Sequence, residues 1–399
     1  MVSHVDILRH VLNEVKSGIK IDGWRITWGD MRYAFISREL LMRITVELMK
    51  FFGAFFREAV LRFTALSCFA EASCMINMGV PPEGVVKKCA EFVSASGWGL
   101  VDVVEVDFKK PRVTIRMYNP SIASWFKNNV KNLEETFPFY ECAWWGYSWV
   151  GVVKAALEAM GIEAPPLVYR ETKCCAKGNR YCEFVIEEGE EAKNNMESYM
   201  SRELFNYRNI KKLADGRYMY GDPRETISLF LRILEARNDG SIGIMEGDSV
   251  LMAPSLLFSL AYWIIPLEKF GEAINTAYKK ACNGYGEYLA KQGGKYGAEA
   301  ILRFFFSSAS SMGWGGMEVT EFTESNIKFR IYQSLYGEDG GAYIKLKGLE
   351  PRPVCAPVGY IAEGVINYFA EKEEGSPLTV KEEKCIAKGD KYCEFTIEK

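Results

Sequence analysis

A pattern of three cysteines and one glutamate occurs twice in this chain of 399 residues, in the same order and with similar spacing. The two sets are Cys142, Glu171, Cys174 and Cys182, and then Cys355, Glu382, Cys385 and Cys393. The surrounding residues repeat as well, because C-A-x-x-G-Y starts at the first cysteine of each set and A-K-G-x-x-Y-C-E-F surrounds the last. We therefore predict a tandem duplication, with one domain at residues 1–188, a second at 222–399 and a linker at 189–221.

Secondary-structure patterns follow the same order in both copies. Each is expected to open with a helix, at His4–Ser17 and at Glu225–Arg237, which a short strand and further amphipathic helices follow. A G-W-G word around Trp98 and again around Trp314 precedes a predicted hairpin in each copy. The alternating apolar residues of these hairpins lie at Val101–Asp107 with Arg112–Tyr118, and at Met317–Phe322 with Ile327–Tyr332. A final hairpin with a Lys-Gly turn carries the last two cysteines of each set.

One stretch of the second copy, Val250–Leu267, is 18 residues long without a charge, which is the lower limit for crossing a membrane. Its counterpart in the first copy is an amphipathic helix from about Ser37, with Leu41, Ile44 and Leu48 on one face. This favours a buried helix at the interface between the two copies, with membrane contact as the alternative. We predict no membrane span.

Composition restricts the compartment and the partners. A net charge of −3 gives no electrostatic reason to expect nucleic acid binding. The N-terminal residues do not resemble a signal peptide. Eleven cysteines in a long chain of this kind indicate metal or redox chemistry more than disulfides. We therefore expect a cytoplasmic protein.

The repeated cysteines and glutamate are suitable ligands for zinc. A tight hairpin brings two thiolates together, the glutamate three residues earlier reaches the same ion, and the distant cysteine completes a tetrahedral shell. A site with four protein ligands is structural rather than catalytic, so we predict two structural zinc ions per chain. Iron is an alternative metal. The other interpretation is that these cysteines are small buried residues of the core.

The words C-x-x-x-G-Y, E-x-x-C and G-[ND]-x-x-C, together with G-W-G, resemble the signature of the 4-vinyl-reductase-type domain family, also called hydrocarbon-binding domains. The resemblance covers both copies. It implies the α/β (α+β) class, with helices packed on an antiparallel sheet and a C-terminal hairpin that carries the metal. Relatives of the family include sensor domains of aromatic-responsive transcription activators, in which the same four ligands hold zinc beside a ligand pocket, and TRAPP-type vesicle-tethering subunits.

Aromatic residues near the repeated words are candidates for a hydrophobic ligand pocket. They are Trp98, Trp144, Tyr147, Trp314, Phe305 and Tyr360. The phenol-sensing relatives use a pocket histidine, whereas this chain has only His4 and His10, both in the first helix. Plain core packing is the alternative role for these aromatic residues.

The leading functional prediction is a protein that binds or senses a hydrophobic or aromatic small molecule, built as an intramolecular pseudo-dimer. We expect no enzyme, because no nucleotide-binding, hydrolase or histidine-based catalytic motif occurs. No output domain is recognisable, so a signal would pass through a protein partner. A ligand-free scaffold and a thiol redox sensor are the alternatives, and homo-oligomerisation stays open.

Overall fold

The computed structural model describes residues 4–398 except 30, 57–59, 138–139, 141, 190–221, 238–240, 245–248, 324–325 and 373–375. The described residues up to 189 are called the first half, and those from 222 onward the second half. The predicted linker at 189–221 lies, except for Gly189, outside the described residues.

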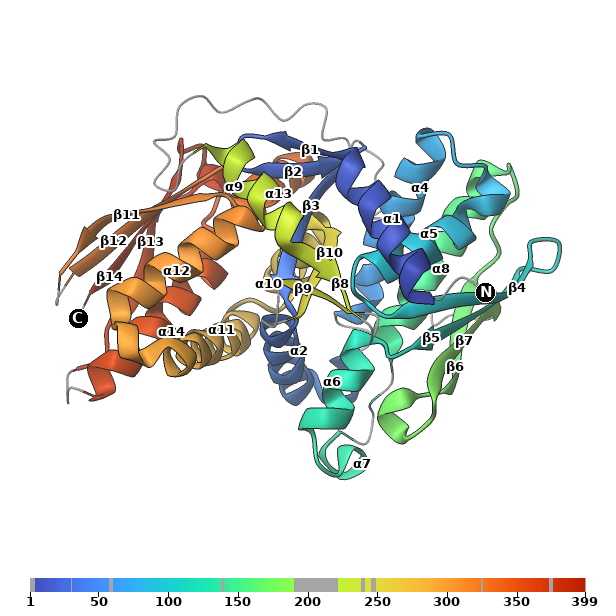
Figure 1. Ribbon diagram of the computed structural model, residues 1–399, viewed down its shortest axis with the longest axis horizontal. Coiled ribbons are helices and arrows are strands. Elements are labelled where there is room, and N and C mark those ends of the chain that lie inside the picture. The colour runs from blue at the N-terminus through green and yellow to red at the C-terminus, as the bar shows by residue number, and fades with distance from the viewer. Residues whose placement is uncertain are drawn as a thin grey trace.

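Each half contains a four-stranded antiparallel sheet with the same strand order. In the first half the order is β4-β5-β7-β6, formed by Leu100–Asp107, Arg112–Tyr118, Tyr181–Glu188 and Leu167–Lys173. In the second half the order is β11-β12-β14-β13, formed by Gly316–Phe322, Asn326–Tyr332, Cys393–Glu398 and Thr379–Lys384. These two outer sheets lie at opposite ends of the molecule (Figure 1). Alternate residues of the inner strands, such as Ile115 and Phe329, are fully buried and face the core.

Helices cover the outer sheets in an equivalent arrangement. Those of the first half are α1 His4–Gly18, α2 Arg38–Phe52, α4 Thr64–Asn77, α5 Val85–Ala95, α6 Ser121–Asn129, α7 Leu133–Thr136 and α8 Ala143–Ala159. Those of the second half are α9 Pro223–Ile233, the π-helix η8 Leu257–Ile264, α10 Ile265–Phe270, α11 Glu272–Gly293, α12 Ala298–Ser311, α13 Leu335–Lys347 and α14 Ala356–Lys372. Helix α4 packs on α8, and α11 packs in the same way on α14. The predicted class, helices on antiparallel sheets with a cysteine-bearing final hairpin, is confirmed.

A third sheet joins the two halves, and the sequence patterns did not predict it. Its strand order is β1-β2-β3-β10-β9-β8, so strands from both halves meet at its centre (Figure 1). The strands are Ile19–Asp22, Arg25–Trp28, Met31–Ser37, Ser249–Pro254, Ile242–Ile244 and Leu234–Ala236. Strands β3 and β10 pair antiparallel with Phe35 opposite Met252. The whole of β3 and the whole of β10 are buried, so this junction belongs to the core.

Two matching sets of hydrogen bonds connect the central sheet to the outer parts of the molecule. The Met252 amide donates to the Ser96 carbonyl at 3.1 Å, and the Trp98 indole N–H donates to the Met252 carbonyl at 2.8 Å. In the same way, the Phe35 amide donates to Met312 at 3.0 Å, and Trp314 donates to the Phe35 carbonyl at 2.6 Å. We call these contacts the first seam, at Trp98, and the second seam, at Trp314. At each seam, the tryptophan of one half is bonded to a strand of the other half.

Two predicted helix boundaries were wrong. The helix expected at Glu225–Arg237 begins at Pro223, because the Asp222 side chain accepts from the Arg224 and Glu225 amides, and it ends at Ile233 before β8. The apolar stretch Val250–Leu267 is not one helix, since its first five residues belong to β10. A buried strand and a buried helix are both continuously apolar, so composition could not separate them. No helix among the described residues is long and apolar enough to span a bilayer.

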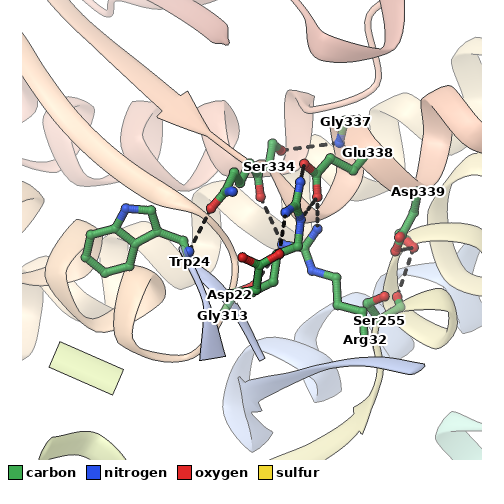
Figure 2. A network of polar contacts seen from close by, with 12 residues as sticks. Asp22, Trp24, Arg32, Ser255, Gly313, Ser334, Gly337, Glu338 and Asp339 are labelled. Atoms are coloured by element: carbon green, nitrogen blue, oxygen red, sulfur yellow. Dashed lines mark hydrogen bonds and ion pairs between the residues drawn. The ribbon is translucent and has the colours of Figure 1, made fainter. Parts of the chain in front are cut away.

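A buried ionic network holds the second seam (Figure 2). Arg25 of β2 and Arg32 of β3 both donate to the Glu338 carboxylate of α13, at 2.8 Å from the Arg25 Nε and 2.7 Å from Arg32. Arg32 also donates to the carbonyls of Gly313 and Gln333. Their side chains are at most 6% exposed. The network therefore attaches the N-terminal strands of the chain to the second half.

Candidate metal centres and adjoining cavities

The first set of predicted ligands comes together at the end of the β6–β7 hairpin. Cys142 immediately precedes α8, Glu171 lies in β6, Cys174 begins the turn and Cys182 lies in β7. Ligand atoms of all four residues lie within 4.8 Å of one another. The Cys142 sulfur is 3.5 Å from that of Cys174 and 3.7 Å from that of Cys182. The turn is possible because Gly178 adopts a positive φ of 91°.

The second set repeats this geometry on the β13–β14 hairpin. Cys355 precedes α14, and its sulfur lies 3.9 Å from that of Cys385 and 3.2 Å from that of Cys393. Glu382 lies within the same 4.8 Å limit. Gly389, with φ of 99°, takes the place of Gly178 in the turn. The structure therefore forms two clusters of the same composition, each of which could hold a metal ion.

The donor atoms fit a four-coordinate metal ion. Sulfur atoms bound at about 2.3 Å to a tetrahedral zinc ion are about 3.8 Å apart, close to the spacings observed here. In each cluster one glutamate oxygen accepts from a backbone amide, at 3.1 Å for Glu171 with Cys142 and 3.0 Å for Glu382 with Cys355. The other oxygen of each glutamate is buried and has no hydrogen-bond partner within the described part of the chain. A buried carboxylate oxygen without a partner is costly, and a metal ion would satisfy it.

The electrostatics of the clusters show that negative charge is concentrated there. Burial and the nearby Cys174 thiolate raise the pKa of Glu171 to about 8, and burial also raises the pKa of Glu382. Hydrogen bonds from the neighbouring thiols lower the pKa of Cys174 to about 3 and that of Cys385 to about 2. Each cluster thus readily forms one thiolate, and a cation would stabilise the fully ionised set.

Groups around the two clusters differ in detail. The Cys182 and Cys393 sulfurs both accept a backbone N–H, at 3.1 and 3.4 Å. The Tyr140 hydroxyl lies 3.4 Å from the Cys142 sulfur, whereas in the second cluster the Ser334 hydroxyl lies 3.2 Å from that of Cys355. The sequence patterns did not identify these outer groups. Such groups orient the ligands of a metal site.

A cavity adjoins the first cluster, and we call it the metal-side cavity. It has about 30 Å³ of room for the centres of water-sized molecules, within an empty space of about 480 Å³. Most of its wall is apolar, including Met49, Phe56 and Phe126, and Cys142 and Trp144 also line it. The unmodified cavity holds about two or three water-sized groups, so a ring-sized ligand requires the lining side chains to move.

A second cavity lies at the first seam, and we call it the seam cavity. It has a similar room of about 30 Å³ within about 330 Å³ of empty space. Met252, Ala253 and Pro254 of β10 close it on the side of the second half. The first half contributes aromatic rings and several polar groups. The polar residues are Glu71, Ser67, Ser96, Ser148 and Cys68.

The predicted ligand-binding residues are divided between these regions. Trp144 lines both cavities, and Trp98, whose ring centre is 5.1 Å from that of Trp144, lines the seam cavity. Tyr147 is buried against Tyr169 at 5.0 Å and lines neither of the two cavities.

The three candidates of the second half also lie outside both cavities. Trp314 is bonded to Phe35 at the second seam, and Phe305 packs against the Trp314 ring at 6.4 Å. The Tyr360 hydroxyl donates to Asn275. A binding role for these six residues stays a prediction.

Glu71 is the site residue that the sequence patterns missed. It lies on α4, a helix whose other buried positions are mostly apolar, and only 5% of its surface is exposed. A single acidic residue on an apolar helix face was the available signal. Its surroundings could not be predicted, because β10 and Tyr33 reach it only through the central sheet.

Known proteins show likeness to parts of the chain. The family model of the vinyl-4-reductase domain matches residues 350–399, which contain all four ligands of the second cluster. This confirms the predicted resemblance for the C-terminal segment. No curated protein matches the chain. Among solved structures, the phenol-responsive sensory domain of the transcription activator PoxR with phenol is similar, with 16% identity and a TM-score of 0.36. The similarity covers 48% of this chain and 95% of that domain.

Proposed function

We propose that this protein binds a hydrophobic small molecule and that two structural zinc ions stabilise its two homologous domains, residues 1–188 and 222–399. The domains form an intramolecular pseudo-dimer around the central sheet. The observation that carries the zinc assignment is the buried glutamate oxygen without a partner in each cluster. Three thiolates and a carboxylate fill a tetrahedral zinc shell and leave no open position for substrate, which supports a structural role.

The metal-side cavity supports the binding role. Its wall is formed by aliphatic and aromatic side chains, and Cys142 belongs to both the cavity wall and the first metal cluster. A hydrophobic ligand there would contact the helix start that the metal positions. Ligand binding and the geometry of α8 are therefore connected, which is what a sensor requires.

Elemental analysis of the full chain, purified without added metal or chelator, tests the zinc assignment. Close to two zinc ions per chain is the expected result. Folded protein that carries essentially no metal would contradict it, and two iron ions would correct the identity of the metal.

Native mass spectrometry and competition with a fluorescent hydrophobic probe test the binding role. We expect co-purified hydrophobic material, or a probe that Met49→Glu displaces from the metal-side cavity without loss of zinc. The control is Met78→Glu, because Met78 is 51% exposed and lies away from this cavity.

A ligand-free scaffold is the second candidate function. The observation that favours it is the small room, about 30 Å³, in each of the two cavities. Under this alternative, the protein carries two zinc ions but no probe binds and no material co-purifies. The two measurements together separate the candidates.

A further inference from the structure

We propose that the seam cavity is a binding site for a small organic amine in its ammonium form, and that the equivalent position of the second half has lost this capacity. None of the eight metal ligands lines this cavity. The inference therefore goes beyond the zinc centres and the metal-side cavity, and it can fail while they hold.

Glu71 is a buried carboxyl group without a counter-ion. One of its oxygens accepts from the Tyr33 hydroxyl at 2.9 Å. Among the described residues no Lys, Arg or His contributes to its electrostatics, and the ionisable groups that face it are Tyr33, Cys68 and Cys89. Burial raises the pKa of Glu71 to about 7. An ammonium group beside it would provide the missing positive charge and favour the carboxylate.

Two further polar atoms of the cavity wall support a ligand rich in hydrogen-bond donors. The hydroxyl oxygens of Ser67 and Ser96 are buried and have no hydrogen-bond partner within the described residues. Each oxygen can accept a hydrogen bond, and burying it without one is costly. An ammonium group has three N–H donors and no acceptor, so Glu71, Ser67 and Ser96 match its three donors.

The remaining wall suits the organic part of such a ligand. Phe92, Trp98 and Trp144 line the cavity, and the Trp98 and Trp144 rings are 5.1 Å apart. Aromatic faces attract organic cations, most strongly when water is excluded. The room of about 30 Å³ restricts the ligand to a few heavy atoms. A short alkylammonium ion fits these limits better than a large ring system.

Helix packing identifies the equivalent positions in the second half. A side chain added at Gly151 of α8 would meet the Ala65 carbonyl at 2.2 Å, and one at Gly364 of α14 would meet the Asn283 carbonyl at the same distance. The α4–α8 and α11–α14 pairs are therefore superposable, with offsets of 218 and 213 residues. The repeated G-W-G words set an offset of 216 near Trp98.

These offsets place mostly hydrocarbon side chains where the first half has polar ones. Glu71 corresponds to Leu289, Ser96 to Met312, Ser148 to Ile361 and Ser67 to Tyr285. No carboxyl group stands at any of these second-half positions. The polar wall is therefore a property of the first seam and is not required by the fold, which indicates a ligand rather than a structural need.

Titration of the full, zinc-loaded chain with n-propylamine at pH 7 tests this inference. The amine is protonated at this pH, and 1-propanol and propionate are its neutral and anionic counterparts of similar size. We expect a saturable change of tryptophan fluorescence and a higher melting temperature with the amine only. A chain that gives no saturable response to the amine, or an equal response to 1-propanol, would overturn the proposal.

Variants assign the response to the cavity. Glu71→Gln keeps an acceptor for Tyr33 and should weaken amine binding at least tenfold, whereas Glu83→Gln removes the same charge from an exposed position and should change nothing. Ser67→Ala provides a second test if Glu71→Gln does not fold, with a threefold or larger loss expected. Unchanged affinity in the folded variants would also overturn the proposal. Zinc content measured on the same samples separates this outcome from failure of the zinc assignment.

Discussion

The two metal clusters are alike, whereas the two seams are not. Both clusters have the same four ligand types, the same glutamate-to-amide hydrogen bond and the same glycine in the turn. The first seam, however, contains a cavity with polar groups, and the second contains the network of Arg25, Arg32 and Glu338. The comparison indicates that the metal hairpins stabilise both halves in the same way, while each seam has a separate task.

The ionic network has no equivalent in the first half. Asn119 and Gln333 both adopt a positive φ, 48° and 52°, immediately after equivalent strands. This correspondence places Ser124 of α6 at the position of Glu338. The first seam therefore lacks the carboxylate that receives two arginines at the second seam. We infer that the second seam is the rigid connection and the first is the adaptable one.

Removal of a metal ligand should have the largest effect and should be equal in the two halves. We expect Cys174→Ser and Cys385→Ser each to lose one zinc ion of two and to lower the free energy of unfolding by more than about 4 kcal/mol, because loss of a structural metal removes its folding energy. Elemental analysis and urea unfolding followed by circular dichroism measure both effects.

Cys89→Ala is the control for these variants, since Cys89 is buried but belongs to neither cluster. It should retain two zinc ions. If only one of the two serine variants loses metal, the two clusters are not functionally alike, and the likeness on which the comparison rests is broken.

Breaking the network at the second seam should have the next largest effect. Glu338→Ala leaves Arg25 and Arg32 buried without their carboxylate, which costs about 3–5 kcal/mol. Chemical denaturation measures this loss. Glu394→Ala removes the partner of Arg330 at a site where the arginine side chain is 34% exposed, and it should cost about 1 kcal/mol or less. Equal losses in the two variants would mean that the network does not hold the second seam.

The sequence was sufficient to predict the outer parts of each half but not their connection. The hairpins, the helix at Cys142 and the ligand sets were visible because each depends on local periodicity, a glycine turn or a repeated word. Strands β3 and β10 pair over more than 200 positions of the sequence, and both are buried on all sides. They therefore show no alternation of polar and apolar residues that would reveal a strand.

The candidate site shows the same division. The metal ligands were predicted from spacing, because a short hairpin determines which side chains converge. The seam cavity combines α4, α5 and α8 with β10 of the other half, so no local pattern includes it. Glu71 and Met252 meet at this cavity only after the central sheet has formed.

The buried carboxyl of the first seam should give that half its own pH dependence. Burial raises the pKa of Glu71 from 4.5 to about 7 in the folded protein. Between these values the folded state binds more protons than the unfolded state, so the free energy of unfolding falls as pH rises, by about 3 kcal/mol. Because Leu289 takes this position in the second half, Glu71→Gln should abolish this contribution entirely.

The measurement is the difference in unfolding free energy between wild type and Glu71→Gln at pH 4.5, 5.5, 6.5 and 7.5, which cancels the contributions of other groups. Glu83→Gln should give a flat difference over the same range. A flat difference for Glu71→Gln would mean that water reaches the carboxyl and that the first seam is not dry.

The smallest expected effects test whether the helix pairs of the two halves pack alike. Gly151→Ala and Gly364→Ala each place a methyl group 2.2 Å from a backbone carbonyl oxygen of the facing helix, which forces α4 and α8, or α11 and α14, apart. Overpacking of this kind costs about 1–3 kcal/mol. Thermal and urea unfolding should show similar losses for the two variants. If Gly151→Ala is clearly the milder change, the α4–α8 pair can yield where α11–α14 cannot, and the first half is the adaptable one throughout its helices rather than only at its seam.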